Sequence, residues 1–338
     1  MNVLVTGIAG FIGFHLSKTL MDYDVNVIGI DNLNNYYDID LKYSRLKLLG
    51  INFDENKNKE KFCYSDSYGN KIKFYHTGID ELNSIDEIFK DNEIDVVCNL
   101  AAQAGVRYSI ENPAEYIKTN IVGYYNVIES SKKYKVKKFI YASSSSVYGN
   151  SDEVPYNELQ QIDKPISLYA ATKKSNELIA YSYSSLYSLN TIGLRFFTVY
   201  GPWGRPDMAY FKFVKNILED KPIQIYNNGD LSRDFTYIDD IIRGLVKVIF
   251  KENDLENNYS VFNIGNNSPV NLLEFVEVIE SILNKKAKKV FMPMQPGDVN
   301  ITWANIDSFV NEFKYKPTTE ILNGLNSFIN WYKDFYNK

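Results

Sequence analysis

Short apolar runs alternate with longer segments of helical apolar spacing over residues 1–200. The runs that predict strands are 3–6, 25–31, 73–76, 95–100, 138–143 and 191–196. The segments that predict helices are 11–21, 41–49, 85–90, 114–132 and 168–187. The stretch 32–71 is polar, and beyond its helix it predicts a surface excursion. This alternation predicts an α/β fold: a doubly wound parallel sheet of the Rossmann type, covered by helices on both faces.

The pattern changes after Gly201. Proline interrupts it at positions 202, 206 and 222, and the later elements are shorter and mixed. Helical spacing returns at 209–219, 239–250 and 272–283, with short runs such as 259–264 between them. We therefore expect a dinucleotide-binding Rossmann domain over 1–200. A smaller mixed α/β domain over 201–338 is expected to be partly interleaved with the first.

Composition and charge narrow the possible functions. The chain is 45% hydrophobic with a net charge of −5, which indicates a folded protein but not a general nucleic-acid binder. No apolar run approaches the roughly 18 residues of a membrane span, and no secretion signal is recognisable, so we expect a cytoplasmic protein. With two His and two Cys, a His-rich metal site, a Ser-His-Asp hydrolase or a disulfide framework is disfavoured. In an enzyme of this composition, another residue type has to move protons.

A glycine-rich turn follows the first predicted strand and opens the first helix. Gly7, Gly10 and Gly13 are spaced G-x-x-G-x-x-G. Glycine at such a turn lets a diphosphate approach the backbone amides, where the helix N-terminus favours anions. Asp31 ends the second strand, which suits a carboxylate that binds the adenosine ribose hydroxyls and repels a 2′-phosphate. The combination predicts NAD rather than NADP.

Two further motifs carry candidate chemistry. Tyr169 and Lys173 form a Y-x-x-x-K pair on one face of a predicted helix. An ammonium beside a phenol lowers the phenol pKa from about 10 toward neutrality, which makes Tyr169 a candidate general base. The serine run 143–146 ends the strand 138–143, at the sheet edge where ligands bind in open α/β folds. Its hydroxyls are suited to bind a substrate oxygen.

With these motifs in this order, the chain resembles the extended short-chain dehydrogenase/reductase family of NAD-dependent nucleotide-sugar epimerases and dehydratases. The segments 101–109, 195–209, 234–240 and 295–299 are similar to its UDP-glucuronate 4-epimerase branch. The resemblance implies NAD that stays bound throughout the cycle. It also implies that Tyr169 removes the proton of the sugar 4-hydroxyl while hydride passes from C4 to NAD, and that hydride then returns to the other face of the 4-keto sugar. The second domain is then the nucleotide-sugar-binding domain.

The resemblance assigns roles to individual residues. The expected catalytic residues are Ser144, Tyr169 and Lys173. The expected NAD-binding residues are Gly7, Gly10, Phe11, Ile12, Gly13, Asp31, Asn32, Leu100, Ala101, Ala102, Tyr169 and Lys173. The expected UDP-sugar-binding residues are Arg107, Ser144, Ser145, Thr198, Arg205, Arg233 and Asp298. Within this last set, the resemblance places Arg233 at the UDP diphosphate and Asp298 near the uridine ribose, and no metal is implied.

Departures from related enzymes refine the interpretation. Sugar 4,6-dehydratases carry Asp-Glu where this chain has Ser145 and Ser146, and decarboxylases carry Glu at position 146. Many UDP-hexose epimerases carry Asn where this chain has Thr198. The hydroxyl groups are compatible with a hexuronate carboxylate, and Arg205 and Arg107 are its candidate charged partners. A contact of Asp80 with the adenine stays open.

Three interpretations compete. The first is 4-epimerisation of UDP-glucuronate to UDP-galacturonate, and the second is 4-epimerisation of a neutral UDP-hexose or its N-acetyl derivative. The third is a catalytically silent nucleotide-binding regulatory protein. The resemblance also implies a homodimer, formed through the helix that carries Tyr169 and the helix predicted over 114–132. His15 is expected to be a packing residue, and Trp203 either lines the sugar site or caps the core.

Overall fold

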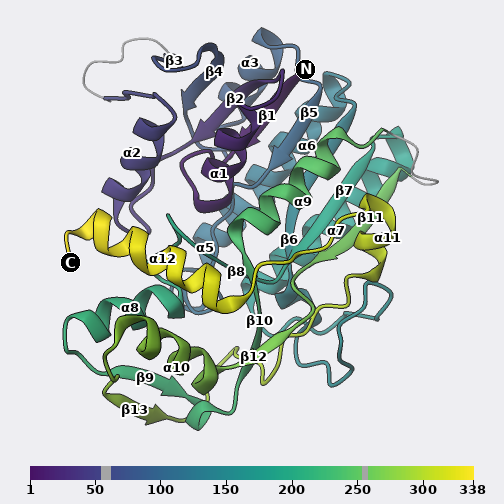
Figure 1. Ribbon diagram of the computed structural model, residues 1–338. Helices are drawn as coiled ribbons and strands as arrows, with labels where there is room; N and C mark the ends of the chain where they lie inside the picture. The colour runs from purple at the N-terminus through teal and green to yellow at the C-terminus, as the bar shows by residue number, and fades with distance from the viewer. Residues whose placement is uncertain (55–61, 253–257) are drawn as a thin grey trace.

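The computed structural model describes residues 1–54, 62–252 and 258–338. Its largest unit is an eight-stranded sheet in the order β11-β7-β6-β5-β1-β2-β4-β3 (Figure 1). These strands are β1 (Asn2–Thr6), β2 (Asn26–Asp31), β3 (Phe62–Ser65), β4 (Gly69–His76), β5 (Val96–Asn99), β6 (Lys138–Ser144), β7 (Thr191–Phe196) and β11 (Tyr259–Ile264). Strand β3 pairs antiparallel with β4, and the other neighbours pair in parallel. The expected doubly wound parallel sheet is confirmed.

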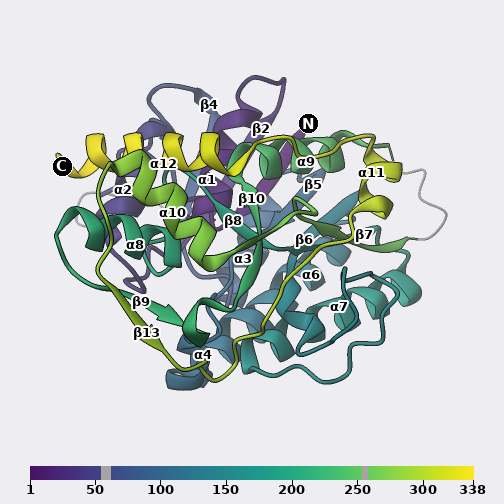
Figure 2. The same ribbon diagram turned by 60° about the horizontal axis from the view of Figure 1, so that its bottom comes forward.

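Helices cover both faces of this sheet (Figure 2). One face packs against α1 (Phe11–Leu20), α2 (Ile39–Leu48), α9 (Ile238–Phe250) and α11 (Asp307–Phe313). The other face packs against α3 (Leu82–Asp91), α6 (Tyr124–Lys133) and α7 (Leu168–Tyr187). All six residues of β7 are buried, because a parallel strand between two helix layers has no solvent face.

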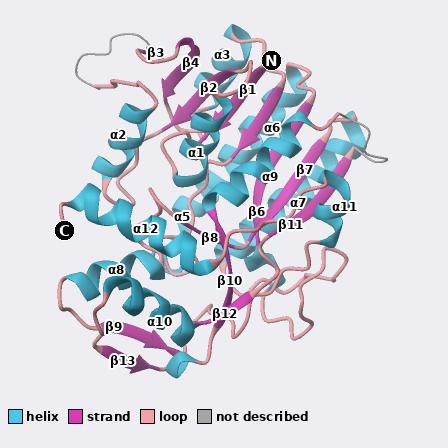
Figure 3. Cartoon of the chain, in the orientation of Figure 1, coloured by secondary structure: helices cyan, strands magenta, loops and turns pink. Residues whose placement is uncertain are grey.

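The second domain has its own hydrophobic core. Figure 3 shows the helices and strands of this domain grouped below the large sheet. Its helices are α8 (Ala209–Leu218), α10 (Leu272–Leu283) and α12 (Ile321–Tyr336). Its strands are β8 (Thr198–Tyr200), β10 (Ser232–Tyr237) and β12 (Pro269–Asn271) in one sheet, and β9 (Ile223–Tyr226) and β13 (Lys289–Met292) in another. Rings of Phe235 and Phe275 stack at 4.1 Å in this core.

The chain passes between the domains more than once. Strand β11 lies well after Gly201, yet it extends the large sheet by pairing with β7. Helices α9 and α11 also pack on the large sheet, although both follow residue 200. Segments after residue 200 thus complete the large sheet and one of its helix layers.

The region predicted as one helix over 114–132 is segmented. It consists of α5 (Pro113–Tyr116), the π-helix Ile117–Gly123 and α6, and the short helix α4 (Tyr108–Glu111) precedes it. Strand β3 was not predicted, because its residues belong to a polar stretch without strand periodicity. Residues 55–61 of the expected surface excursion lie outside the described residues. In the part of the chain that the structure describes, no helix is long and apolar enough to cross a membrane.

Candidate active site

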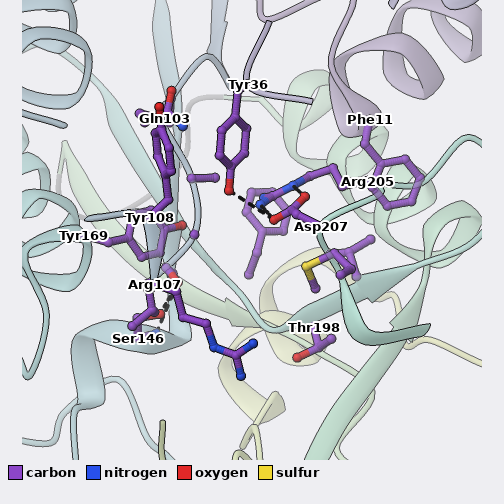
Figure 4. A pocket seen from close by; sticks show the side chains of 18 of the residues that line it. Phe11, Tyr36, Gln103, Arg107, Tyr108, Ser146, Tyr169, Thr198, Arg205 and Asp207 are labelled. Atoms are coloured by element: carbon purple, nitrogen blue, oxygen red, sulfur yellow. Dashed lines mark hydrogen bonds and ion pairs between the residues drawn. The ribbon is translucent and has the colours of Figure 1, made fainter. Parts of the chain in front are cut away.

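A cavity of about 1190 Å³ opens at the carboxyl ends of the large sheet's strands and is lined by residues of both domains (Figure 4). Its walls contain all the expected cofactor residues, Gly7, Gly10, Phe11, Ile12, Gly13, Asp31, Asn32, Leu100, Ala101, Ala102, Tyr169 and Lys173. They also contain the expected substrate residues Arg107, Ser144, Ser145, Thr198, Arg205, Arg233 and Asp298. The fold therefore brings the whole predicted set to one place. This is the sheet edge at which open α/β folds bind ligands.

The glycine turn is a backbone cradle. A Cβ on Gly13 would lie 2.1 Å from the carbonyl oxygen of Gly7, and one on Gly10 would lie 2.9 Å from the same atom. Gly7 has φ +75°, a conformation that favours glycine. Helix α1 begins at Phe11, so its first amide groups and its dipole face the cavity. The turn fits the diphosphate of a dinucleotide.

Asp31 lies at the end of β2 beside this turn. Its carboxylate accepts hydrogen bonds from the amides of Ala9, at 3.1 Å, and Leu33, at 2.9 Å. These bonds fix a negative charge in the wall of the cavity, where it suits a ribose with free hydroxyls. Lys42 from α2 lies 3.9 Å from Asp31 and also lines the cavity. The sequence analysis missed Lys42, because it looks like one more polar residue of an amphipathic helix.

Helix α7 places Tyr169 and Lys173 in the cavity. The helix begins after Ser167, whose hydroxyl accepts from the amide of Ala170 at 3.1 Å. Tyr169 lies in its first turn, and Lys173 follows one turn later. The Lys173 Nζ donates to the carbonyl oxygen of Ala142 at 2.8 Å and lies 6.0 Å from the centre of the Tyr169 ring. Ser144 ends the neighbouring strand, so the three expected catalytic residues share this wall.

The prediction that Lys173 lowers the pKa of Tyr169 is wrong for this structure. Burial raises the pKa of Tyr169, and the groups that oppose this effect are the Ser144 hydroxyl and the Arg205 guanidinium. Burial also lowers the pKa of Lys173 to about 7. The reason is geometric, because the ammonium is directed to a backbone carbonyl and is itself desolvated.

A buried hydrogen-bond network holds the catalytic segments together. Glu177, one turn after Lys173 on α7, accepts two bonds from Arg195 of β7 and one from the Ser143 hydroxyl of β6. Arg195 also donates to the hydroxyl of Tyr148 at 2.9 Å. The network was not predicted. Its only signals in the sequence are an arginine within an apolar strand and a glutamate on a helix, and neither indicates its partner.

A second hydrogen-bonded group lies in the cavity wall. Arg205 donates through Nε and Nη2 to Asp207, and the hydroxyl of Tyr36 donates to the same carboxylate at 3.3 Å (Figure 4). Arg205 and Tyr169 line the same cavity, and the Arg205 charge opposes the effect of burial, which raises the pKa of Tyr169. Thr198 begins β8 on the same cavity wall. Tyr36 and Asp207 are further residues that the sequence analysis missed.

Arg107 and Asp298, which both line the cavity, form an ion pair between the two halves of the chain. Their side chains are 3.1 Å apart, and the Arg107 guanidinium lies 4.8 Å from the Tyr226 ring. Arg233 donates to the carbonyl oxygens of Ser232 and Asn300, and burial lowers its pKa. These cationic groups suit the phosphates of a nucleotide sugar.

Three residues left open by the sequence are now placed. Asp80 lines the cavity and pairs with Lys118 at 3.1 Å. His15 packs edge-on against Phe14, and burial lowers its pKa to about 4, as expected of a packing residue. Trp203 packs against Trp331 and Phe14, so it caps the core.

Known proteins resemble this chain over its whole length. The model of the NAD dependent epimerase/dehydratase family matches residues 3–265. Protein CapI of Staphylococcus aureus is 49% identical, over 100% of both chains. UDP-glucuronate 4-epimerase 1 of Arabidopsis thaliana is 44% identical, over 99% of this chain and 77% of that protein. The crystal structure of UDP-glucuronic acid 4-epimerase from Bacillus cereus, in complex with UDP-glucuronic acid and NAD, matches with a TM-score of 0.87 and 34% identity, over 99% of this chain and 100% of that one.

Proposed function

Because the chain belongs to the NAD dependent epimerase/dehydratase family and is an NAD-dependent UDP-sugar epimerase, we propose that it converts UDP-glucuronate to UDP-galacturonate. One observation carries the choice of sugar. The cavity is lined by an arginine, Arg205, together with the base Tyr169 and the hydroxyls of Ser144, Ser145 and Thr198. A carboxylate-bearing sugar matches this combination of one cation and several hydroxyls better than a neutral sugar does.

Tyr169 is the proposed base. It removes the proton of the sugar 4-hydroxyl, with Ser144 sharing a hydrogen bond to the same oxygen. When NAD is bound, it accepts the hydride from C4 and returns it, so no net redox change occurs. Lys173, which lies one turn after Tyr169 in the wall of the same cavity, holds the nicotinamide ribose. Rotation of the 4-keto sugar within the cavity presents its other face, and Tyr169 returns the proton.

The 4-keto sugar of a uronate is a β-keto acid, which can lose carbon dioxide. A site that restrains the carboxylate protects this intermediate. We assign the carboxylate to Arg205 and the phosphates to Arg107 and Arg233. Asp298, paired with Arg107, lies on the uridine side. Ser145 and Ser146 stand where dehydratases carry acids, so the groups that drive elimination are missing at these positions.

A homodimer is part of the proposal. Helices α6 and α7 lie side by side (Figure 2) and carry exposed apolar side chains. Together with the preceding π-helix they expose Ile117, Val122, Tyr125, Leu178, Tyr181 and Leu186. Apolar surface gathered on adjacent helices is typical of a subunit interface. Light scattering of Leu178→Lys, expected to be monomeric, checks the assignment against the parent protein.

The substrate is tested directly by supplying UDP-glucuronate, UDP-glucose and UDP-N-acetylglucosamine separately and following the products by NMR. We expect UDP-galacturonate from the first sugar at much the highest rate. Turnover of only the neutral sugars would favour the hexose epimerase instead. Carbon dioxide release with a pentose product would indicate a decarboxylase, and no turnover with no bound NAD would indicate the silent protein.

A further inference from the structure

Three side chains from two segments of the chain form a hydrogen-bonded group in the cavity wall. Nε and Nη2 of Arg205 donate to the two carboxylate oxygens of Asp207, at 3.0 and 2.5 Å. The Tyr36 hydroxyl, from the segment after β2, donates to Asp207 as well. In Figure 4 the Tyr36 ring points straight at this ion pair. The first domain therefore contributes to holding an arginine of the segment between β8 and α8.

The backbone nearby is shaped to admit Tyr36. Gly105 has φ +104°, and a Cβ there would lie 2.7 Å from the Tyr36 hydroxyl oxygen. The Tyr36 ring also packs on the Tyr108 ring, with centroids 4.7 Å apart. Any other residue at position 105 would both strain the turn and displace the hydroxyl. Tyr36 is thus a fixed partner of the pair, not a loosely placed surface residue.

The geometry of the pair leaves part of the arginine for a ligand. Both bonds to Asp207 come from the side of the guanidinium that carries Nε and Nη2. An arginine has a second edge with two donors, formed by Nη1 and Nη2, which also matches a carboxylate. The Arg205 side chain is 23% exposed and lines the cavity with Tyr169 and Thr198.

We propose that Asp207 and Tyr36 are positioning residues that hold the Nη1–Nη2 edge of Arg205 toward the carboxylate of the sugar, and so set the preference for a uronate. This inference rests on the proposed function. A guanidinium oriented before the ligand arrives loses less side-chain freedom on binding, so its contact contributes more affinity. An unanchored Arg205 is free to adopt other rotamers and to meet the carboxylate through a single bond.

The same pair acts on the base. Arg205 lowers the pKa of Tyr169 and Asp207 raises it, while burial raises it and the Ser144 hydroxyl lowers it. The other groups facing Tyr169 are Lys173 on its own helix and the ring of Tyr116. Loss of the Asp207 charge should therefore lower the pKa of Tyr169, whereas loss of the Arg205 charge should raise it. A merely structural contact would not shift the acidic limb of the pH profile in opposite directions.

The test uses NAD-bound enzyme and the variants Asp207→Asn, Asp207→Glu, Tyr36→Phe and Arg205→Met. The control is Glu219→Gln, which removes the carboxylate of an exposed pair with the same spacing, Glu219 and Lys221. Calorimetry measures the Kd of UDP-glucuronate and of UDP-glucose, and kcat/KM is followed against pH. We expect Asp207→Asn to raise the Kd of UDP-glucuronate by a factor on the order of tenfold larger than its effect on the Kd of UDP-glucose.

We further expect Asp207→Glu to restore most of that preference and Tyr36→Phe to reduce it by roughly two- to fivefold. The control should change neither the preference nor the pH profile. The inference is overturned if Asp207→Asn raises the Kd of both sugars equally, or of neither, and leaves the acidic limb of the pH profile unmoved. If Asp207→Asn fails to fold, an unchanged preference in Tyr36→Phe overturns it. If the parent enzyme shows no preference for UDP-glucuronate, the proposed function fails. The action of the pair on Tyr169 is then tested with whichever sugar is turned over, because Asp207→Asn and Arg205→Met should still shift the acidic limb of the pH profile in opposite directions.

Discussion

The carboxylate of Glu177 accepts two hydrogen bonds from the guanidinium of Arg195, at 2.8 and 2.9 Å, in the interior of the protein. The two side chains are 1% and 4% exposed. Glu177 lies on the helix of Tyr169, and Arg195 lies on the strand that leads to Thr198. The Ser143 hydroxyl, adjacent to Ser144, donates to the same carboxylate. One ion pair therefore connects the segments that carry the base, its hydroxyl partner and the substrate wall.

Glu177→Gln should destabilise the protein strongly. The change leaves the Arg195 charge buried with no carboxylate, and breaking a buried pair in this way costs about 3–5 kcal/mol. Urea unfolding monitored by circular dichroism measures the change in the free energy of unfolding. Glu219→Gln, in an exposed pair, is the control and should change it by less than about 1 kcal/mol. Equal stability of the two variants would contradict the role of the network.

Tyr169→Phe should abolish turnover and leave NAD bound. The phenylalanine keeps the ring and removes the group that accepts the proton, so we expect kcat to fall by roughly 10²–10⁴. The rate is followed by NMR, and NAD is measured in the acid-released supernatant. Tyr183→Phe, which removes from the same helix a half-buried hydroxyl bonded to Glu129, is the matched control and should keep its rate. A near-normal rate in Tyr169→Phe would mean that another residue is the base.

Gly13→Ala should reduce the binding of NAD. Its Cβ would meet the carbonyl oxygen of Gly7 at 2.1 Å, and backbone atoms cannot move aside as a flexible side chain can. The turn must then open, which displaces the amides at the start of α1 from the diphosphate. NAD content after purification and the Kd of added NAD measure the effect. Ser17→Ala, on the same helix, serves as control, and a normal NAD content in Gly13→Ala would refute the close packing of the turn.

Lys173 should make the stability of the NAD-free protein depend on pH. Burial lowers the pKa of Lys173 from 10.5 to about 7. Between these values the unfolded chain holds a proton that the folded protein has released. Stability therefore rises with pH across this window, by up to about 1.4 kcal/mol per pH unit from this group, and is reduced below pH 7, where the buried amine has to be charged.

The variant Lys173→Met removes this dependence. Free energies of unfolding are compared at pH 6, about 7.5 and 9 in both proteins, so that all other groups cancel in the difference. We expect the variant to gain stability relative to the parent as the pH falls. If the free energies of unfolding of the two proteins changed in parallel with pH, the Lys173 amine would have to stay protonated in the folded protein.

The bounds of helices and strands were predicted best where the residues at their ends mark them, as a capping serine or a glycine turn does. Helix α7 is observed over 168–187 as expected, because Ser167 caps its N-terminus and its apolar positions keep helical spacing. The glycine turn was equally readable, since its constraint lies within seven residues. The π-helix at Ile117–Gly123 was not, because its sequence keeps ordinary helical spacing.

The parts of the site that escaped prediction depend on contacts between distant positions. Tyr36 and Asp207 are 171 residues apart, and nothing local to either indicates that they meet. Glu177 and Arg195 look like ordinary charged residues until the fold buries both. The pKa of Tyr169 was misjudged for the same reason, because desolvation in the folded protein raises it and is opposed only in part by the Ser144 hydroxyl and Arg205.

The return of the chain to the large sheet at β11 limits how this enzyme can be divided. Neither domain is a continuous piece of sequence, because β11 and α9 complete the first domain from within the second half of the chain. A chimera that exchanged everything after residue 200 would remove one edge of the sheet and a helix from its face. A change of sugar specificity therefore requires the exchange of individual loops, such as the segment between β8 and α8, while the rest of the chain is kept intact.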